Sequence, residues 1–232
     1  AAVVGARAVE VPRPVVVAVA SDLHANSTVG LCPPTGLDLD DGQRVEPSAL
    51  QEWLWRGWEG YAARVAAQVA SLDAELYVVL AGDLVEGDHH RTTQIMTRNL
   101  QDQHRLAMAC LGPLRALHPA RWFVARGTEA HVGPGATTEE LIAEALEAEP
   151  DPETGRRSWW HLRAEILGTR FDVAHHGRTG SYGWTRNNGA NSQASQVFWE
   201  SARRKADPPH YVIRGHRHKR AKGSCEGIEV HQ

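Results

Sequence analysis

A six-residue apolar run, Val15–Ala20, ends directly before the polar sequence Ser21–His24. The run is short, rich in β-branched residues and preceded by Pro14, which predicts a fully buried β-strand. Asp22 and His24 lie two residues apart, a spacing that points both side chains the same way on extended backbone. A carboxylate beside an imidazole suits a divalent metal ion. Alone the pair is a weak signal, because a solvated loop accounts for it at least as often.

The first half of the chain alternates predicted strands with predicted helices. Two more apolar runs of strand length follow the first, Leu76–Leu80 and Arg121–Ala125. The segment 25–47, rich in Gly, Pro and Asp, is expected to be an irregular active-site loop. Apolar spacing and helix-start signals predict three helices, over 47–72, 92–117 and 137–148. This order implies a largely parallel α/β sheet.

The second half changes character. Apolar and polar residues alternate over Trp159–Ile166, which predicts an antiparallel hairpin with Arg170–His175. A polar, Gly-rich loop is expected over 177–191, followed by a helix over 192–205 and a last strand, His210–Arg214. We find no linker or internal repeat, and we therefore expect residues 1–232 to form one domain of mixed α/β class with mixed sheets.

Composition limits the possible partners and compartment. The net charge of -3, from 25 basic and 28 acidic residues, argues against a broad basic face for nucleic acid. It leaves open nucleic acid in a small metal-lined cleft. Three widely spaced cysteines indicate a reduced, cytoplasmic setting. No apolar run approaches the roughly 18 residues of a membrane span, and residues 1–14 lack the apolar core of a signal peptide, so we expect no membrane partner.

Five segments share one pattern, in which a buried strand is followed by small and ligand-type residues. They are Asp22–His24, Gly82–Asp83, Gly127–His131, His175–Gly177 and Gly215–His218. Ligands bind beyond the carboxyl ends of strands in open α/β sheets, so these segments should converge. Two carboxylates and four or five imidazoles suit a pair of metals about 3.5–4 Å apart better than one ion. Other histidines are expected to be loop or capping residues: His89, His104, His118 and His161.

These motifs resemble those of the calcineurin-like metallophosphoesterases, in the same order and over nearly the whole chain: Asp22-x-His24, Gly82-Asp83 with Gly87 four further on, a later His-Gly, and Gly215-His216-x-His218. The stretch 22–34 resembles the phage- and prophage-encoded branch of that family. The resemblance implies a two-layer β-sandwich of mixed sheets flanked by helices, with the metals at the sheet edge. It also implies a dinuclear, metal-dependent phosphoester hydrolase.

The resemblance assigns metal ligands position by position. The first metal would take three side chains, one carboxylate would bridge, and the second metal would take the remaining histidines: Asp22, His24 and His218 for the first, Asp83 as the bridge, and His216 with His175 or His176 for the second. His175 is preferred because it ends the strand and resembles the family's His-His-Pro variant. His176, directly before Gly177, matches the commoner His-Gly form almost as well. The ions would be Mn, Fe, Zn or Ni.

The third strand end departs from the family pattern. The family usually has Gly-Asn-His there, with the Asn binding the second metal and the His near the leaving group. This chain has no Asn in Gly127–His131. Thr128 or Glu129 could take the Asn position, and His131 could act as general acid or as a ligand.

A mechanism follows from the resemblance. Two metals would polarise the phosphoryl oxygens and hold a bridging hydroxide for in-line attack. Protonated His131 would donate a proton to the leaving oxygen. Arg178 could clamp a phosphate oxygen, although a solvated loop arginine explains it equally well.

Several functions remain open at this point. The leading one is hydrolysis of a phosphoester, by nuclease or phosphodiesterase action on nucleic acid or by phosphatase action on a small molecule or protein. The near-neutral charge favours a small or single-stranded substrate over long duplex. The alternatives are a metal-binding scaffold that has lost catalysis, motivated by the missing Asn, and a single-zinc hydrolase.

Overall fold

A parallel sheet forms the first half of the fold. The computed structural model describes residues 12–88, 91–178 and 185–232. The strands of this sheet lie in the order β1-β4-β5-β6, and every neighbouring pair is parallel. They are β1 (Val15–Ala20), β4 (Glu75–Leu80), β5 (Arg121–Ala125) and β6 (Ser158–Trp159). The three predicted strands and their parallel arrangement are confirmed.

The second sheet is mixed and has the order β10-β11-β9-β8-β7. Its strands are β7 (Leu162–Ile166), β8 (Thr169–Ala174), β9 (Tyr211–Arg214), β10 (Lys222–Cys225) and β11 (Ile228–His231). Strands β7 and β8 form the expected antiparallel hairpin, and β8 pairs with β9 in parallel. The sequence interpretation ended at β9 and missed the hairpin of β10 and β11.

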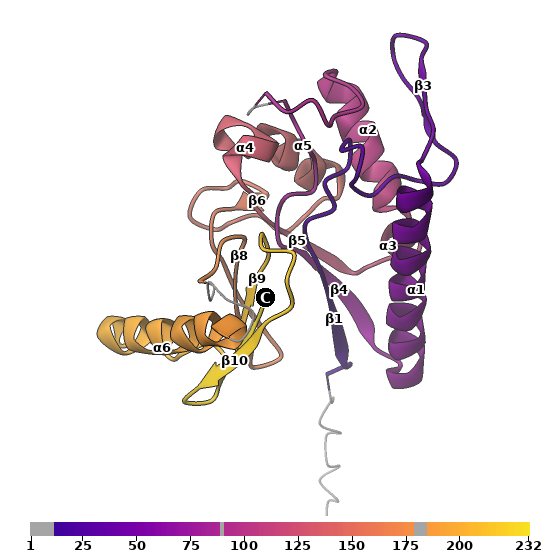
Figure 1. Ribbon diagram of the computed structural model, residues 1–232. Helices are drawn as coiled ribbons and strands as arrows, with labels where there is room; N and C mark the ends of the chain where they lie inside the picture. The colour runs from indigo at the N-terminus through magenta and orange to yellow at the C-terminus, as the bar shows by residue number, and fades with distance from the viewer. Residues whose placement is uncertain (1–11, 89–90, 179–184) are drawn as a thin grey trace, which may run out of the picture.

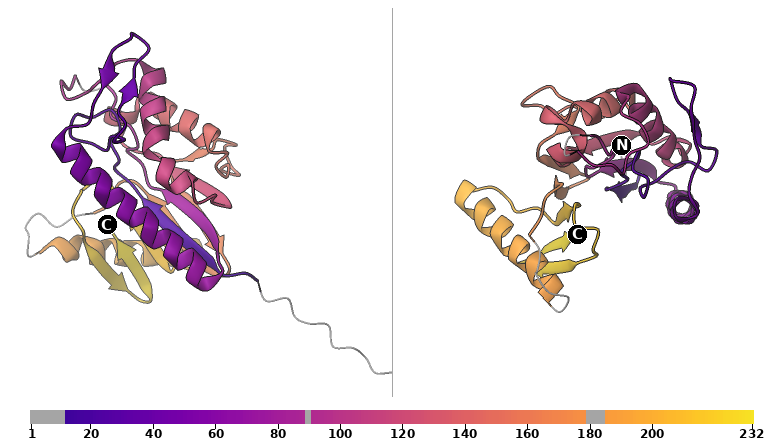
Figure 2. Two further views of the ribbon diagram at one scale, coloured as in Figure 1. Left: turned by 90° about the vertical axis from the view of Figure 1, so that its right-hand side faces the viewer. Right: turned by 45° about the horizontal axis from the view of Figure 1, so that its top comes forward.

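Helices cover the outer face of each sheet, so the layers run helix, sheet, sheet, helix (Figures 1 and 2). One apolar cluster lies between the first sheet and its helices, a second lies between the two sheets, and a third lies under the last helix. The first sheet is covered by α1 (Ala49–Leu72), α2 (Leu100–Cys110), α3 (Gly112–Arg115) and α5 (Thr137–Ala145), and the second by α6 (Arg186–Arg204). The expected sandwich of sheets flanked by helices is confirmed.

Strand β4 is packed against an apolar cluster on each of its two faces. Leu76, Val78 and Leu80 belong to the cluster under the helices, whereas Tyr77 and Val79 belong to the cluster between the sheets. Side chains alternate between the faces of a strand, so a strand buried on both sides needs a continuous apolar run. The run therefore fixes this strand at the centre of the fold.

The predicted helix over 92–117 is wrong at its start. The helix begins only at Leu100, and α3 follows after a break at Leu111. The side chain of Asn26 bonds both backbone groups of Thr97, at 2.9 Å to its nitrogen and 3.0 Å to its oxygen. Asn99 then caps α2. These contacts use the backbone groups that a longer helix would need.

The two expected loops differ in outcome. The segment 25–47 is mostly irregular but contains a short hairpin of β2 (Leu37–Asp38) and β3 (Arg44–Val45). Within the loop expected over 177–191, residues 179–184 lie outside the described residues, and α6 already begins at Arg186. Most of the segment 1–14 also lies outside them. In the described part of the chain, no helix is long and apolar enough to cross a bilayer.

Candidate metal centre

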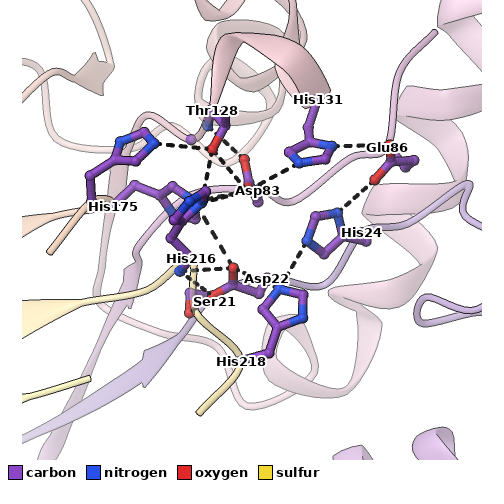
Figure 3. A network of polar contacts seen from close by, with 12 residues as sticks. Ser21, Asp22, His24, Asp83, Glu86, Thr128, His131, His175, His216 and His218 are labelled. Carbon is purple, nitrogen blue, oxygen red and sulfur yellow. Dashed lines mark hydrogen bonds and ion pairs between the residues drawn. The ribbon is translucent and has the colours of Figure 1, made fainter. Parts of the chain in front are cut away.

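The five strand-end segments converge at one edge of the two sheets, where Figure 3 shows their side chains facing one another. The first sheet brings Asp22 and His24 from β1 and Asp83 from β4, and the second sheet brings the C-terminal histidines. Carboxyl ends of parallel strands meet at a shared edge, which is why residues far apart in the sequence become neighbours. The predicted convergence is confirmed.

Five of the converging residues have a left-handed backbone: Asp22 (φ 56°), His24 (φ 42°), Asp83 (φ 53°), His216 (φ 76°) and His218 (φ 47°). Such a conformation costs about 1–3 kcal/mol for a residue with a Cβ and gathers at functional sites. The expected extended backbone at Asp22 and His24 is therefore wrong, although their side chains do meet in one group of possible ligands. Tertiary hydrogen bonds hold them instead, from Asp22 N to Gly82 O at 2.9 Å and from His24 N to Asp83 O at 3.0 Å.

A first group of possible metal ligands joins Asp22, His24 and His218. The Nε2 atom of His218 lies 3.1 Å from Asp22 Oδ1 and 3.2 Å from His24 Nε2. Asp22 also accepts the backbone N–H of His216 at 2.9 Å, which ties β1 to the loop after β9. One carboxylate oxygen and two imidazole nitrogens so close together form a donor set of the kind that binds divalent transition metals.

A second group joins His175, His176 and His216. The rings of His176 and His216 lie 4.5 Å apart. The hydroxyl oxygen of Thr128 lies 3.2 Å from His216 Nδ1 and 3.3 Å from His176 Nε2. Burial, together with neighbouring positive charge, lowers the pKa of His176 and of His216, which favours the neutral rings that can act as ligands.

Asp83 lies between the two groups and is almost fully buried, with 1% exposure. Its Oδ1 accepts the backbone N–H of Thr128 at 2.6 Å, and its Oδ2 lies 2.7 Å from His175 Nε2 and 4.0 Å from His216 Nδ1. Burial raises the pKa of this carboxyl, but the contacts with His175 and Thr128 outweigh it and leave the pKa below its usual value. A carboxylate held ionised between two ligand groups can serve both.

His175 gives the most direct indication that a metal fits. Its Nδ1 lies 2.7 Å from the carbonyl oxygen of Ala81, a contact that places the proton on Nδ1. Its Nε2 is buried 2.7 Å from Asp83 Oδ2, in an ion pair that lacks hydrogen-bond geometry. A ligating histidine shows this arrangement, with one ring N–H given to a carbonyl and the other nitrogen facing the carboxylate that would share the ion. The residues present therefore fit a metal.

Glu86 lies between His24 and His131 (Figure 3). Its Oε2 is 2.8 Å from His24 Nδ1, and its Oε1 is 3.0 Å from His131 Nδ1. Burial raises the pKa of Glu86, but the two imidazoles outweigh it and lower that pKa to about 2. The contact with Glu86, against an opposing effect of burial, raises the pKa of His131. The pair thus favours a protonated His131.

Glu139, in α5, is a fully buried carboxylate beneath the site. Its Oε1 accepts the backbone N–H of Leu84 at 3.1 Å, and its Oε2 accepts that of Gly127 at 2.6 Å. Burial raises the pKa of Glu139 to about 7, against the two N–H donors, which lower it.

A Cβ on Gly127 would lie 2.2 Å from Asp83 Oδ1, so only glycine fits there.

The remaining predicted site residues have different positions. Thr128 lies among the ligand atoms, whereas Glu129 is exposed in the helix α4 (Glu129–Val132) and belongs to none of the ligand groups found among the described residues. Arg178 is exposed, and its guanidinium donates to Ser192 Oγ at 3.2 Å. His161 lies 2.8 Å from Asp172 Oδ2, outside the site.

Three residues of the site escaped the sequence interpretation. Glu86 could have been recognised from the sequence, because an acidic residue three positions after Asp83 remains near the end of the strand. Glu139 carries none, because a glutamate in a helix is usually solvated. Arg217 stands between two predicted ligands, and its charge helps to lower the pKa of both His176 and His216. His89, expected to be a loop residue, lies outside the described residues.

This chain has only weak similarity to known proteins. No protein-family model and no curated protein matches the chain. Vacuolar protein sorting 29 from Cryptosporidium parvum is 13% identical over 93% of this chain and 71% of that chain, with a TM-score of 0.35. Sulfate thiohydrolase SoxB from Thermus thermophilus, in complex with glycerol, is 10% identical over 97% of this chain and 52% of that chain, with a TM-score of 0.41. With scores this low, function rests on the site's own geometry.

Proposed function

We propose that the protein is a metal-dependent phosphoester hydrolase that uses two divalent ions. The observation that carries the proposal is the position of buried Asp83 between two groups of possible ligands. One group would hold the first ion through Asp22, His24 and His218. The other would hold the second through His175 and His216, with Asp83 shared. Thr128 Oγ1, 3.2 Å from His216 Nδ1 and 3.3 Å from His176 Nε2, takes the place of the family's Asn.

The side chains around the ions have separate roles in this proposal. Bound divalent ions would polarise the phosphoryl oxygens and lower the pKa of an attacking water molecule. His131 donates a proton to the leaving oxygen, and Glu86 holds its ring and favours the charged form. Glu86 also contacts His24, which links the proton donor to the first ligand group.

Arg217 is the cation that we assign to the substrate phosphate. Its charge acts on His176 and His216, and its exposed side chain directly follows His216 in the sequence. A guanidinium there binds a non-bridging phosphate oxygen by charge-assisted hydrogen bonds. Arg178 is the weaker candidate, since its guanidinium is directed to Ser192. With a net charge of -3, a small or single-stranded phosphoester fits better than long duplex nucleic acid.

A second candidate function is a metal-binding scaffold without catalysis. It is favoured by Thr128, since a hydroxyl is a weaker ligand than the amide oxygen that the family usually places there. Both candidates predict bound metal, and they differ in turnover.

Metal content and turnover of bis-p-nitrophenyl phosphate test the proposal together. Wild-type protein is expected to bind two ions per chain by elemental analysis and to hydrolyse the ester when manganese is added. Asp83→Asn keeps the shape of the side chain but weakens both sites, so it should lose both properties while its circular dichroism is unchanged. Two bound ions without turnover would support the scaffold, and near-wild-type turnover in Asp83→Asn would exclude the shared-carboxylate centre.

A further inference from the structure

A pocket of about 560 Å³ opens beside the first ligand group. Asp22, His24 and His218 form one end of it, together with Glu86 and His131. The volume lies within the range of about 300–1,000 Å³ typical of small-molecule sites. A phosphate held by the ligand groups would therefore direct one of its substituents into a space of the size of one organic group.

Part of the pocket lining is apolar and aromatic, next to the polar Ser27, Thr92 and Gln94. It is formed by helix α1 and the loop after β1, through Leu54, Trp58, Tyr61, Val29 and Leu31. Among the described residues, no lysine or arginine lines the pocket. An uncharged, mostly apolar group is the occupant that such a wall stabilises, because a charged one would lose its hydration without a counter-ion.

Hydrogen bonds fix the two aromatic rings of the wall. Trp58 Nε1 donates to the carbonyl oxygen of Cys110 at 2.8 Å, and Tyr61 OH donates to that of Val19 at 2.8 Å. The two rings are stacked, with centroids 5.4 Å apart and planes 22° apart. A flat ring can pack against such a wall without the loss of side-chain freedom that a mobile wall would suffer.

We propose that this pocket binds the leaving group of the substrate, and that this group carries an uncharged planar ring. The assignment rests on the proposed phosphoester hydrolysis and adds its substrate class. His131 lines the same pocket, so its proton lies on the side to which the leaving oxygen departs. Two sources supply this chemistry, a nucleoside and an aryl alcohol, and binding experiments distinguish them.

Gly57 allows the pocket to be filled without disturbing the core. It lines the pocket from the middle of α1, and a Cβ there would meet no atom of the described residues within 4 Å. Gly57→Leu should therefore occupy the pocket while removing a glycine that weakens the helix. Gly60→Leu is the matched control, because Gly60 lies on the same helix but outside the pocket lining, with only Arg64 Nη1 at 3.5 Å from its Cβ.

Binding to the metal-free protein tests the pocket separately from catalysis. With metals chelated, the indole N–H resonance of Trp58, identified by its loss in Trp58→Phe, should shift on titration with adenosine or with 2-naphthalenemethanol. Cyclohexylmethanol should shift it far less. Gly57→Leu should weaken ring binding by about tenfold or more, and Gly60→Leu should leave it unchanged.

The outcomes separate this inference from the proposed function. A shift with adenosine identifies a nucleoside leaving group, and a shift with the naphthalene alcohol alone identifies an aryl one. No saturable shift with either, or an equal effect of the cyclohexyl alcohol, would overturn the planar-ring pocket even if the protein hydrolyses phosphoesters. Ring binding without any turnover would instead contradict the proposed hydrolysis but would still support a pocket that binds planar rings.

Discussion

Glu139 accepts the backbone N–H of Gly127, with 2.6 Å between Oε2 and the nitrogen. Its other oxygen accepts the N–H of Leu84, so one buried carboxylate joins the loops that follow β4 and β5. Asp83 directly precedes Leu84, and Thr128 directly follows Gly127. The carboxylate of Glu139 thus fixes the spacing between Asp83 and Thr128, while Glu139 itself belongs to none of the ligand groups found among the described residues.

Replacing this carboxylate should weaken metal binding. In Glu139→Gln one side-chain amide would face a backbone N–H, donor against donor, and one of the two loops must move. We expect metal affinity to fall by about 10–100-fold, as for other residues that orient ligands, measured by competition with a fluorescent chelator.

Glu140→Gln is the control for this prediction. Glu140 accepts the backbone N–H groups of Arg157 and Ser158, at 3.0 and 2.9 Å, away from the ligands. Its variant should lose comparable thermal stability and keep its metal affinity. Equal metal affinity in the two variants would show that Glu139 supports only the fold and has no separate effect on metal binding.

The adjacent histidines should differ in their effect on metal content. His175 Nε2 is buried beside Asp83, whereas His176 is exposed and its Nε2 is nearest a hydroxyl. We expect His175→Ala to bind one ion fewer per chain and His176→Ala to keep both with altered turnover. Elemental analysis after gel filtration decides between them, and the reverse pattern would make His176 the ligand.

His131 should matter most for poor leaving groups. A general acid assists an alkyl leaving oxygen strongly and a p-nitrophenolate little, so His131→Ala should slow an alkyl ester by about 10²–10⁴-fold and an aryl ester far less. Metal content should not change. Glu86→Gln should show the same selectivity in weaker form, because it removes the charge that raises the pKa of His131. Equal slowing of both esters, with loss of an ion, would make His131 a ligand.

The buried pair of Asp172 and Arg214 should make stability fall in acid. Their contact is 2.6 Å between Oδ1 and Nη2. Burial raises the pKa of Asp172, but His161 and Arg214 outweigh it and lower that pKa to about 2 from an ordinary 3.8. A carboxyl group whose pKa is lower in the folded than in the unfolded protein stabilises the fold at pH values above its unfolded pKa. A contribution on the order of 2 kcal/mol to the free energy of unfolding should therefore be lost as pH falls from about 4 towards 2.

Urea unfolding of Asp172→Asn measures this contribution. At pH 7 the variant should lose about 3–5 kcal/mol, since Arg214 remains buried without its partner, and the difference from wild type should shrink below pH 4. Asp38→Asn removes a partner of Arg44 in an exposed ion pair and should leave the free energy of unfolding nearly unchanged. A pH-independent difference for Asp172→Asn would contradict the assignment.

The sequence was enough to predict the central strands of the first sheet and most of the residues that meet at its edge, but not the hairpin of β10 and β11. Runs such as Val15–Ala20 and Leu76–Leu80 can be buried only as strands between two apolar layers, and their order required a parallel sheet. Residues such as Asp22, Asp83 and His216 could be named because they follow such runs, where a parallel sheet exposes its ligands.

The way in which these residues meet depends on contacts between distant parts of the chain. The left-handed backbone at Asp22 and His24 is held by bonds to Gly82 and Asp83, which no local pattern encodes. The extended segment before α2 depends in the same way on the side chain of Asn26. Glu139 in α5 lies 55 residues beyond Leu84, whose N–H it accepts. A buried polar group needs a hydrogen-bond partner, and that partner can come from any part of the chain that the fold places beside it. The spacing of apolar residues in the sequence indicates only which side chains are buried.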